Sequence, residues 1–400
     1  MTTELARRIA ITIGALLIFR LGCYVPLAGI STQAGLLSSG AITRVSIFSL
    51  SLIPYLSAAI IVQLLSRVWR RLSAFERSGE AGRRKLARIT LILTLLLASF
   101  QAFGITSAIE NISGLVVEPG GWFLLSATAS MVGGVFFLIW LSEQMTRHGV
   151  GNGLALILCV GIVVSLPAEV ATALELLRQG AVSSNFVLFN VIVWVTLAAV
   201  MVLVESARRN VPVQYAARQV GRRLLAPRSS VLPIKLNSAG FLIPATVTPW
   251  VFYLPLALAT FSFGQTPWLA KAYAHLQFGQ PAHIILGSIV IFVLAFIYTA
   301  NVLDPERAAE TLQEQGGTIQ GVAPGEATAD HLDRIASLTT VVGAVYLVIV
   351  SLIPEALVAG GVALPYKIGG GSVLIVICTI LDLKKQVRDL SLTSRGGERI

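Results

Sequence analysis

Charged residues are scarce in this chain. Aspartate, glutamate, lysine and arginine make up 12% of its 400 residues. A soluble domain typically carries about 25%. Hydrophobic residues account for 55% of the chain, and its mean hydropathy is +0.79. This composition excludes an ordinary water-soluble domain and predicts helices that lie in lipid.

Residues that carry chemistry are scarce as well. Cys23, Cys159 and Cys378 lie singly inside apolar runs, so neither a disulfide framework nor a zinc site is indicated. The sequence has no GxxxxGK[ST] loop for nucleotide phosphates and no HExxH pair. We therefore expect no metal, no cofactor and no enzymatic activity, and a partner must drive anything that passes through the chain.

Acidic residues are missing from the middle of the apolar runs. Glu143, Glu205 and Asp382 fall at the ends of runs, and Glu175 falls outside them. Ionisable groups at membrane depth are costly and usually mark ion or substrate pathways. Their absence counts against a secondary transporter of small solutes, which is the alternative from another functional class.

Apolar runs are what the chain has in abundance. A chain that crosses hydrocarbon satisfies its backbone hydrogen bonds internally, so it crosses as helices of roughly 20 residues. The runs cover about 9–27, 45–66, 89–108, 122–142, 150–167, 186–204, 238–262, 284–303, 335–353 and 368–381. We predict an all-α polytopic membrane protein with ten transmembrane helices.

Basic residues fall mainly on one side of these ten spans. With the N-terminus inside, 25 of the 30 lysines and arginines are cytoplasmic, so both termini are predicted to be cytoplasmic. The net charge of +10 then reflects basic loops that face anionic lipid. Five spans in each half also permit two inverted halves, 1–180 and 181–400, around a central pore.

Two of the predicted cytoplasmic loops are long. The loop 206–236 is strongly basic, and its Val211–Tyr215 stretch reads as a strand, which predicts a protruding hairpin. The loop 304–334 is acidic and is interrupted by Gly316-Gly317 and Pro324-Gly325. Adhesion to lipid headgroups would explain the basic charge, but the length and the hairpin favour a docking surface.

Short motifs along nearly the whole chain resemble, in order, those of SecY-type protein-translocation channels. The resemblance is strongest at Ser46–Ala58, which is similar to the second transmembrane helix of that family. The other matching motifs are Phe19–Gly22, Val25–Ile30, Gly79–Lys85, Trp140–Gln144, Gly149–Gly153, Pro212–Ala216, Leu232–Asn237, Pro324–Glu326 and Ile368–Ser372. Their collinear order makes a chance match very improbable.

This resemblance implies a function and a pore. Unfolded polypeptides would pass between two five-helix halves, and hydrophobic segments would leave sideways between helices two and seven. The family's apolar pore ring maps onto Leu52, Leu56, Leu154, Leu158, Thr246 and Ile375. Thr246 follows Phe241–Pro244, a stretch with one residue more than the family pattern. The lateral gate maps onto Pro54 and Ser57, where the proline would favour a bend.

The resemblance also implies partners. They are small SecE- and SecG-like subunits, a SecA-like motor ATPase or a ribosome, unfolded polypeptides and anionic lipids, in the bacterial inner membrane. The predicted docking residues are Arg208, Arg209, Tyr215, Arg218, Arg222, Arg223, Pro324, Gly325 and Glu326.

Two departures from the family pattern stand out. Only Ser31–Thr43 separates Ile30 from Arg44, which leaves room for about one helical turn where relatives carry a plug helix, so we expect the apolar ring alone to seal the resting pore. Ala323 stands where the family has a docking arginine. Because of these departures, a further alternative is that the chain is a specialised or degenerate paralogue and acts as a scaffold.

Overall fold

The structure is a computed structural model. It describes residues 3–30, 46–69, 72–73, 75, 78–112, 114–215, 218–220, 223–225, 228–243, 274–276, 280–302, 304–359 and 369–396. Three predicted features lie outside these residues: the shortened Ser31–Thr43 segment, Thr246 with most of the seventh span, and Arg222.

Helices make up most of the described residues. Their bounds are α1 Thr3–Gly22, α3 Ile53–Val68, α5 Gly79–Glu110, α6 Gly121–His148, α7 Gly153–Arg178, α8 Ser184–Ser206, α11 Pro281–Val302, α12 Pro305–Glu314, α13 Glu326–Ala359 and α14 Gly370–Gly396. Within the described residues, α5, α6, α7, α8, α11 and α13 are long and apolar enough to cross a membrane, and α3 is a shorter apolar helix. The predicted spans 89–108, 122–142, 186–204 and 335–353 lie inside α5, α6, α8 and α13, and most of 150–167 lies inside α7. The first span, predicted over 9–27, ends earlier because α1 ends at Gly22.

Helix ends differ from the predicted run ends where charge or proline intervenes. The second run was expected from residue 45, but α3 begins at Ile53, after turns at Ser46–Leu52. Pro54 therefore lies in the first turn of α3, where its missing N–H has no helical acceptor to lose. The bend expected at Pro54 has no cause at this position.

Two helices extend beyond the apolar runs from which they were predicted. Helix α7 continues to Arg178 and takes in Glu175, which the sequence places outside a span. Helix α13 takes in Glu355, whose side chain pairs with His283 of α11 and is buried with it. Sequence reasoning missed this pair because Glu355 lies just past the apolar run.

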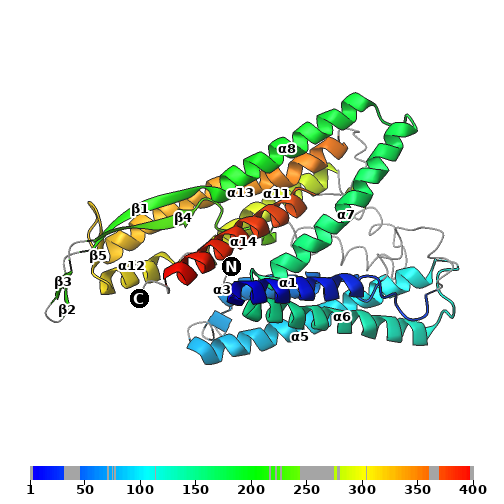
Figure 1. The fold of residues 1–400 in the computed structure, drawn as a ribbon, viewed down its shortest axis with the longest axis horizontal. Coiled ribbons are helices and arrows are strands. Elements are labelled where there is room, and N and C mark those ends of the chain that lie inside the picture. Colours follow the sequence, from blue (N-terminus) through cyan, green and yellow to red (C-terminus); the bar gives the residue numbers. More distant parts are fainter. Residues whose placement is uncertain are drawn as a thin grey trace.

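Two groups of helices lie one above the other in Figure 1. The first group is α1, α3, α5 and α6, and the second is α8, α11, α13 and α14, while α7 runs obliquely between them. Helix α7 contacts α1 and α6 on one side and α8 and α14 on the other, and α3 contacts α11. The first group holds two apolar clusters, one around Leu138 and one around Met131, and the second group holds one around Leu347 and Leu374.

The predicted hairpin is confirmed. Strand β1, Arg208–Tyr215, pairs antiparallel with β4, Arg228–Lys235, and the short strands β2, Arg218–Val220, and β3, Arg223–Leu225, pair near its tip. Val211 and Val213 are buried while their neighbours are exposed, which is the alternation expected of a strand with one face covered.

An unexpected third strand joins the two long loops. Strand β5, Gly317–Ile319, pairs with β1, so the sheet order is β4-β1-β5. Helix α12 covers one face of it, and its first turn is capped by the Asp304 side chain, which accepts from the Arg307 amide at 3.2 Å. The shared apolar core consists of Val211, Val213, Ile234, Leu312, Ile319 and Leu332. We call β1, β4, β5 and α12 the strand module; it projects from one end of the helices in Figure 1.

Candidate functional site

An apolar cluster lies where the two helix groups meet. Leu56 of α3, Leu158 of α7 and Ile375 of α14 contact one another and are 3%, 9% and 4% exposed. Leu154, Ile162, Phe241 and Leu242 are partly buried against them. We call these seven residues the waist cluster. Four of the six predicted ring residues belong to it, and they come from both halves of the sequence.

The start of α7 is fixed by its capping residue. The Asn152 side chain accepts hydrogen bonds from the backbone amides of Leu154, at 3.0 Å, and Ala155, at 3.4 Å. This cap supplies partners for amides that have none inside the helix. Leu154 and Leu158, four residues apart, then face the same side of α7 and reach the waist cluster together.

The facing helix, α14, is bound to α7 by a side chain one turn from the cluster. The buried Thr379 hydroxyl lies 2.6 Å from the Ile375 carbonyl oxygen of its own helix and 3.4 Å from the Ala155 carbonyl oxygen of α7. Thr379 therefore lies at the contact between α14 and α7, one turn from Ile375.

Leu52 packs elsewhere. It is fully buried in the core that also holds Leu138 and Ile157, and Leu154 contacts both that core and the waist cluster. The reason is local: Leu52 precedes α3 as its N-cap residue, and Ser51 before it has φ +51°. The i, i+4 rule that relates Leu52 to Leu56 holds only inside a helix.

Sequence reasoning missed three members of the waist cluster. Ile162 lies four residues after Leu158 on α7, so the helical repeat would have identified it. Phe241 and Leu242 belong to the stretch with one residue more than the family pattern. That extra residue was the only sequence feature that pointed to an altered contribution of this stretch to the cluster.

The predicted gate residues lie at the start of α3. Pro54 is buried, and Ser57 is 5% exposed with no hydrogen-bond partner for its hydroxyl among the described residues. Helix α3 contacts α11 of the other group. A polar group buried without a partner destabilises the packing there.

The predicted docking residues that the structure describes belong to, or adjoin, the strand module. Arg208 and Arg209 are exposed at the base of the hairpin, and Arg218 and Arg223 lie on the paired strands near its tip. Tyr215 is half-buried and packs on Gly317 of β5. The second predicted surface, Pro324–Glu326, lies at the start of α13.

The 323–326 corner is held by its own hydrogen bonds. The Thr328 hydroxyl donates to the Ala323 carbonyl at 2.8 Å, and its amide donates to the Gly325 carbonyl at 3.0 Å. Gly325 has φ +93°, a conformation that favours glycine. Ala323 is exposed, so the position where the family carries an arginine faces solvent without a charge.

Comparisons with known proteins agree with this geometry. The SecY family model matches residues 46–384. The protein translocase subunit SecY of Escherichia coli strain K12 is 38% identical over 413 residues, covering 98% of this chain and 93% of that protein.

Solved structures share the fold. One, described as showing that the SecY plug domain stabilises the closed channel and maintains a membrane seal, has a TM-score of 0.70 at 19% identity, covering 97% of this chain and 93% of that chain. Sec61 in the canine ribosome-channel complex has a TM-score of 0.66 at 17% identity, with the same coverage of 97% and 93%. The predicted ten-helix membrane fold in two halves around a pore is confirmed.

Proposed function

This chain belongs to the SecY family, and from that premise we propose how its pore is closed, opened and driven. It is a channel subunit through which unfolded polypeptides cross the membrane and from which hydrophobic segments enter the membrane. The observation that carries the proposal is the waist cluster, because it is built from elements of both halves and its side chains are all apolar.

The waist cluster acts as the resting seal. A narrow apolar passage excludes water and small ions by dewetting, but it yields to an extended chain. Leu56, Leu154, Leu158 and Ile375 form its wall. Leu52 and Thr246 stay predicted ring positions, and Thr246 lies outside the described residues. Because these side chains are held by packing alone, a polypeptide can displace them without breaking hydrogen bonds.

The halves 1–180 and 181–400 move apart to open the lateral gate beside Pro54 and Ser57. Separate apolar cores in the two helix groups support this proposal, since each group can move as a body. A sufficiently apolar segment in the pore then partitions into lipid.

The strand module docks the driver, either a ribosome or a motor ATPase. Its hairpin carries Arg208, Arg209, Arg218 and Arg223, and such a surface steers negatively charged partners. The relation to Sec61 of a ribosome-channel complex supports a ribosome. Small SecE- and SecG-like subunits cover lipid-facing helices, and anionic lipids contact the basic loops.

The chain lies in the bacterial inner membrane with both termini cytoplasmic, on the side of the strand module. The excess of basic residues on that side and the bacterial relatives support this placement. The chain itself has no catalytic role in this proposal.

Replacement of a bacterium's resident channel subunit by this chain tests the function. Export of a reporter with a signal sequence, measured with and without the motor ATPase, should continue. A matched strain carrying Leu158→Asp should lose export, because a charge would sit inside the waist cluster. Failure of the unmodified chain to export the reporter while it still assembles with partners would instead support the scaffold alternative. Uptake of small solutes by vesicles would support the transporter alternative.

A further inference from the structure

The stretch Leu236–Ile243, which we call the anchor turn, carries the chain from the strand module to the waist cluster. Its first residue donates from the Leu236 amide to the Ala207 carbonyl at 3.2 Å. At its far end, Phe241 and Leu242 belong to the waist cluster, and Ile243 is fully buried in the apolar core around Leu347 and Leu374.

A buried asparagine organises the middle of the anchor turn. Asn237 is 3% exposed, and both ends of its amide are used. Its Nδ2 donates to Glu205 Oε1 of α8 at 2.7 Å, and its Oδ1 accepts from the Gly240 amide at 3.1 Å. Gly240 has φ +69°, so the amide that Asn237 binds belongs to the residue at which the chain reverses.

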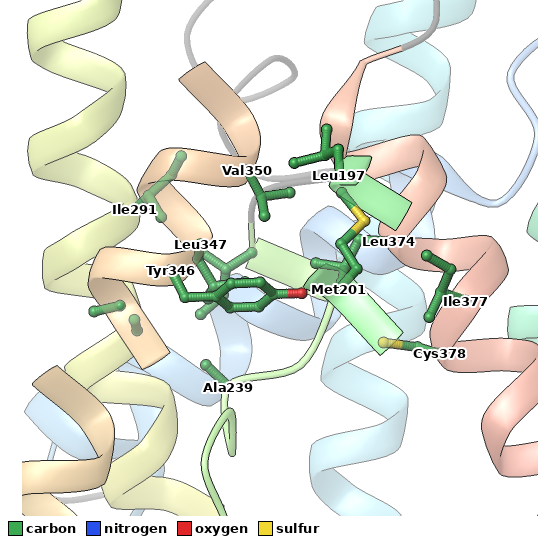
Figure 2. Close-up of a cluster of buried hydrophobic side chains, with 13 residues drawn as sticks. Leu197, Met201, Ala239, Ile291, Tyr346, Leu347, Val350, Leu374, Ile377 and Cys378 are labelled. Atoms are coloured by element: carbon green, nitrogen blue, oxygen red, sulfur yellow. The ribbon is translucent and has the colours of Figure 1, made fainter. Parts of the chain in front are cut away.

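Three helices meet at this hydrogen bond. Beside the Glu205 carboxylate of α8 lie the Tyr346 hydroxyl of α13 and the Cys378 thiol of α14. Figure 2 shows Tyr346 pointing from α13 toward Met201 of α8, with Cys378 of α14 close by. Helix α13 also makes room for the turn, because a Cβ at Gly343 would lie 2.7 Å from the Leu236 carbonyl oxygen.

Packing alone does not hold Phe241 and Leu242 in place. A cavity of about 390 Å³ lies behind them, and its lining also includes Glu205, Asn237 and Asp382. Side chains that border a cavity lose contact energy on that side. The polar anchor at Asn237 therefore limits how far Phe241 and Leu242 can retreat from the waist.

We propose that Glu205 and Asn237 are positioning residues for the resting seal. Their hydrogen bond holds Phe241 and Leu242 against Leu56, Leu158 and Ile375, so that the anchor turn closes the side of the waist formed by the second half. This inference rests on the proposed function, since it assigns the closing part of the same pore.

A charge swap tests the proposal. Asn237→Asp removes the amide donor and places two carboxylates in contact, whereas Glu205→Gln combined with Asn237→Asp restores an amide–carboxylate hydrogen bond with donor and acceptor exchanged. In proteoliposomes of the purified channel complex without a driver, Asn237→Asp should raise potassium efflux about tenfold or more, which equals about 1.4 kcal/mol in favour of the open waist. The double variant should return efflux to that of the unmodified chain.

A matched control separates positioning from general destabilisation. Asn190→Asp makes the same change at a buried asparagine of α8, whose amide donates to the Phe186 carbonyl at 3.0 Å, away from the anchor turn. It should leave efflux unchanged. The proposal is overturned if Asn237→Asp leaks no more than the unmodified chain. It is also overturned if the double variant leaks as much as Asn237→Asp, or if Asn190→Asp leaks.

Two further measurements keep the result interpretable. If Asn237→Asp fails to accumulate, Glu205→Ala removes the acceptor without adding charge, and its efflux should still rise. Export of the signal-bearing reporter by the unmodified chain is measured in parallel. Normal export with a tight Asn237→Asp channel refutes only the positioning role, whereas loss of export by the unmodified chain refutes the proposed function.

Discussion

The Gly151 backbone amide donates a hydrogen bond to the Gln386 side-chain oxygen and so joins the turn before α7 to α14 of the other half. Gly151 has φ +89°, and a Cβ there would lie 2.8 Å from Leu156 Cδ1 and 3.2 Å from Leu383 Cδ1. The two halves are therefore in close contact beside the pore ring, where no side chain fits between them.

Gly151→Ala should destabilise the channel complex by about 1–3 kcal/mol, because it adds both backbone strain and a clash. Thermal unfolding of the purified complex measures the effect. Gly180→Ala is the matched control, since Gly180 also has positive φ, +70°, but faces open space. Equal losses from the two substitutions would show that crowding against α14 contributes nothing.

Leu158→Ser should raise resting ion efflux through the channel, because a hydroxyl in the waist cluster allows water to enter the constriction. Efflux from proteoliposomes without a driver measures this. Leu188→Ser, at a position of α8 that is 60% exposed, makes the same change on a lipid-facing surface and should have no effect. If the Leu158→Ser channel stays impermeable to ions, the waist cluster does not form the seal.

Ile319→Asp should abolish docking of the driver while the helices remain folded. Ile319 is 4% exposed in the strand module core, and a buried unpaired charge costs several kcal/mol. Binding of the driver to membranes measures the loss of docking, and thermal unfolding of the complex measures whether the helices remain folded. Thr318→Asp, one residue earlier and exposed, should leave docking intact; loss in both variants would point to surface charge rather than the core.

Ala323→Arg should increase driver-dependent export if coupling is weak in this chain, because it restores a positive charge to an exposed corner and raises the association rate with an acidic partner. Reporter export at limiting motor ATPase measures it. Gln320→Arg adds the same charge elsewhere in the loop and should give a smaller gain. No gain from Ala323→Arg would shift attention to the shortened Ser31–Thr43 segment.

Local patterns allowed much of this molecule to be predicted. The apolar runs that the structure describes formed helices because burial in lipid is decided over about 20 consecutive residues. Val211–Tyr215 formed a strand because its alternation is visible within eight residues. Leu56, Leu154, Leu158 and Ile375, four of the residues that the resemblance named together, lie in one cluster; their role as a pore ring stays a prediction.

Non-local features could not be predicted. The pairing of β5 with β1 joins residues about a hundred positions apart, and Gly317–Ile319 alone is too short and too polar to read as a strand. Leu52 lies outside the waist cluster because it precedes the start of α3. Phe241 and Leu242 join that cluster from a stretch whose buried hydrogen bond, between Asn237 and Glu205, spans 32 positions of the sequence.

The shared sheet of the strand module limits how this channel can be re-engineered. Its apolar core takes Val211, Val213 and Ile234 from the segment after α8, Leu312 and Ile319 from the segment before α13, and Leu332 from α13. A transplant of the basic hairpin alone from a relative would meet a mismatched Leu312 and Ile319, and a transplant of the acidic segment alone would meet a mismatched Val211 and Val213. Chimeras that aim to change the preferred driver must therefore exchange both segments together.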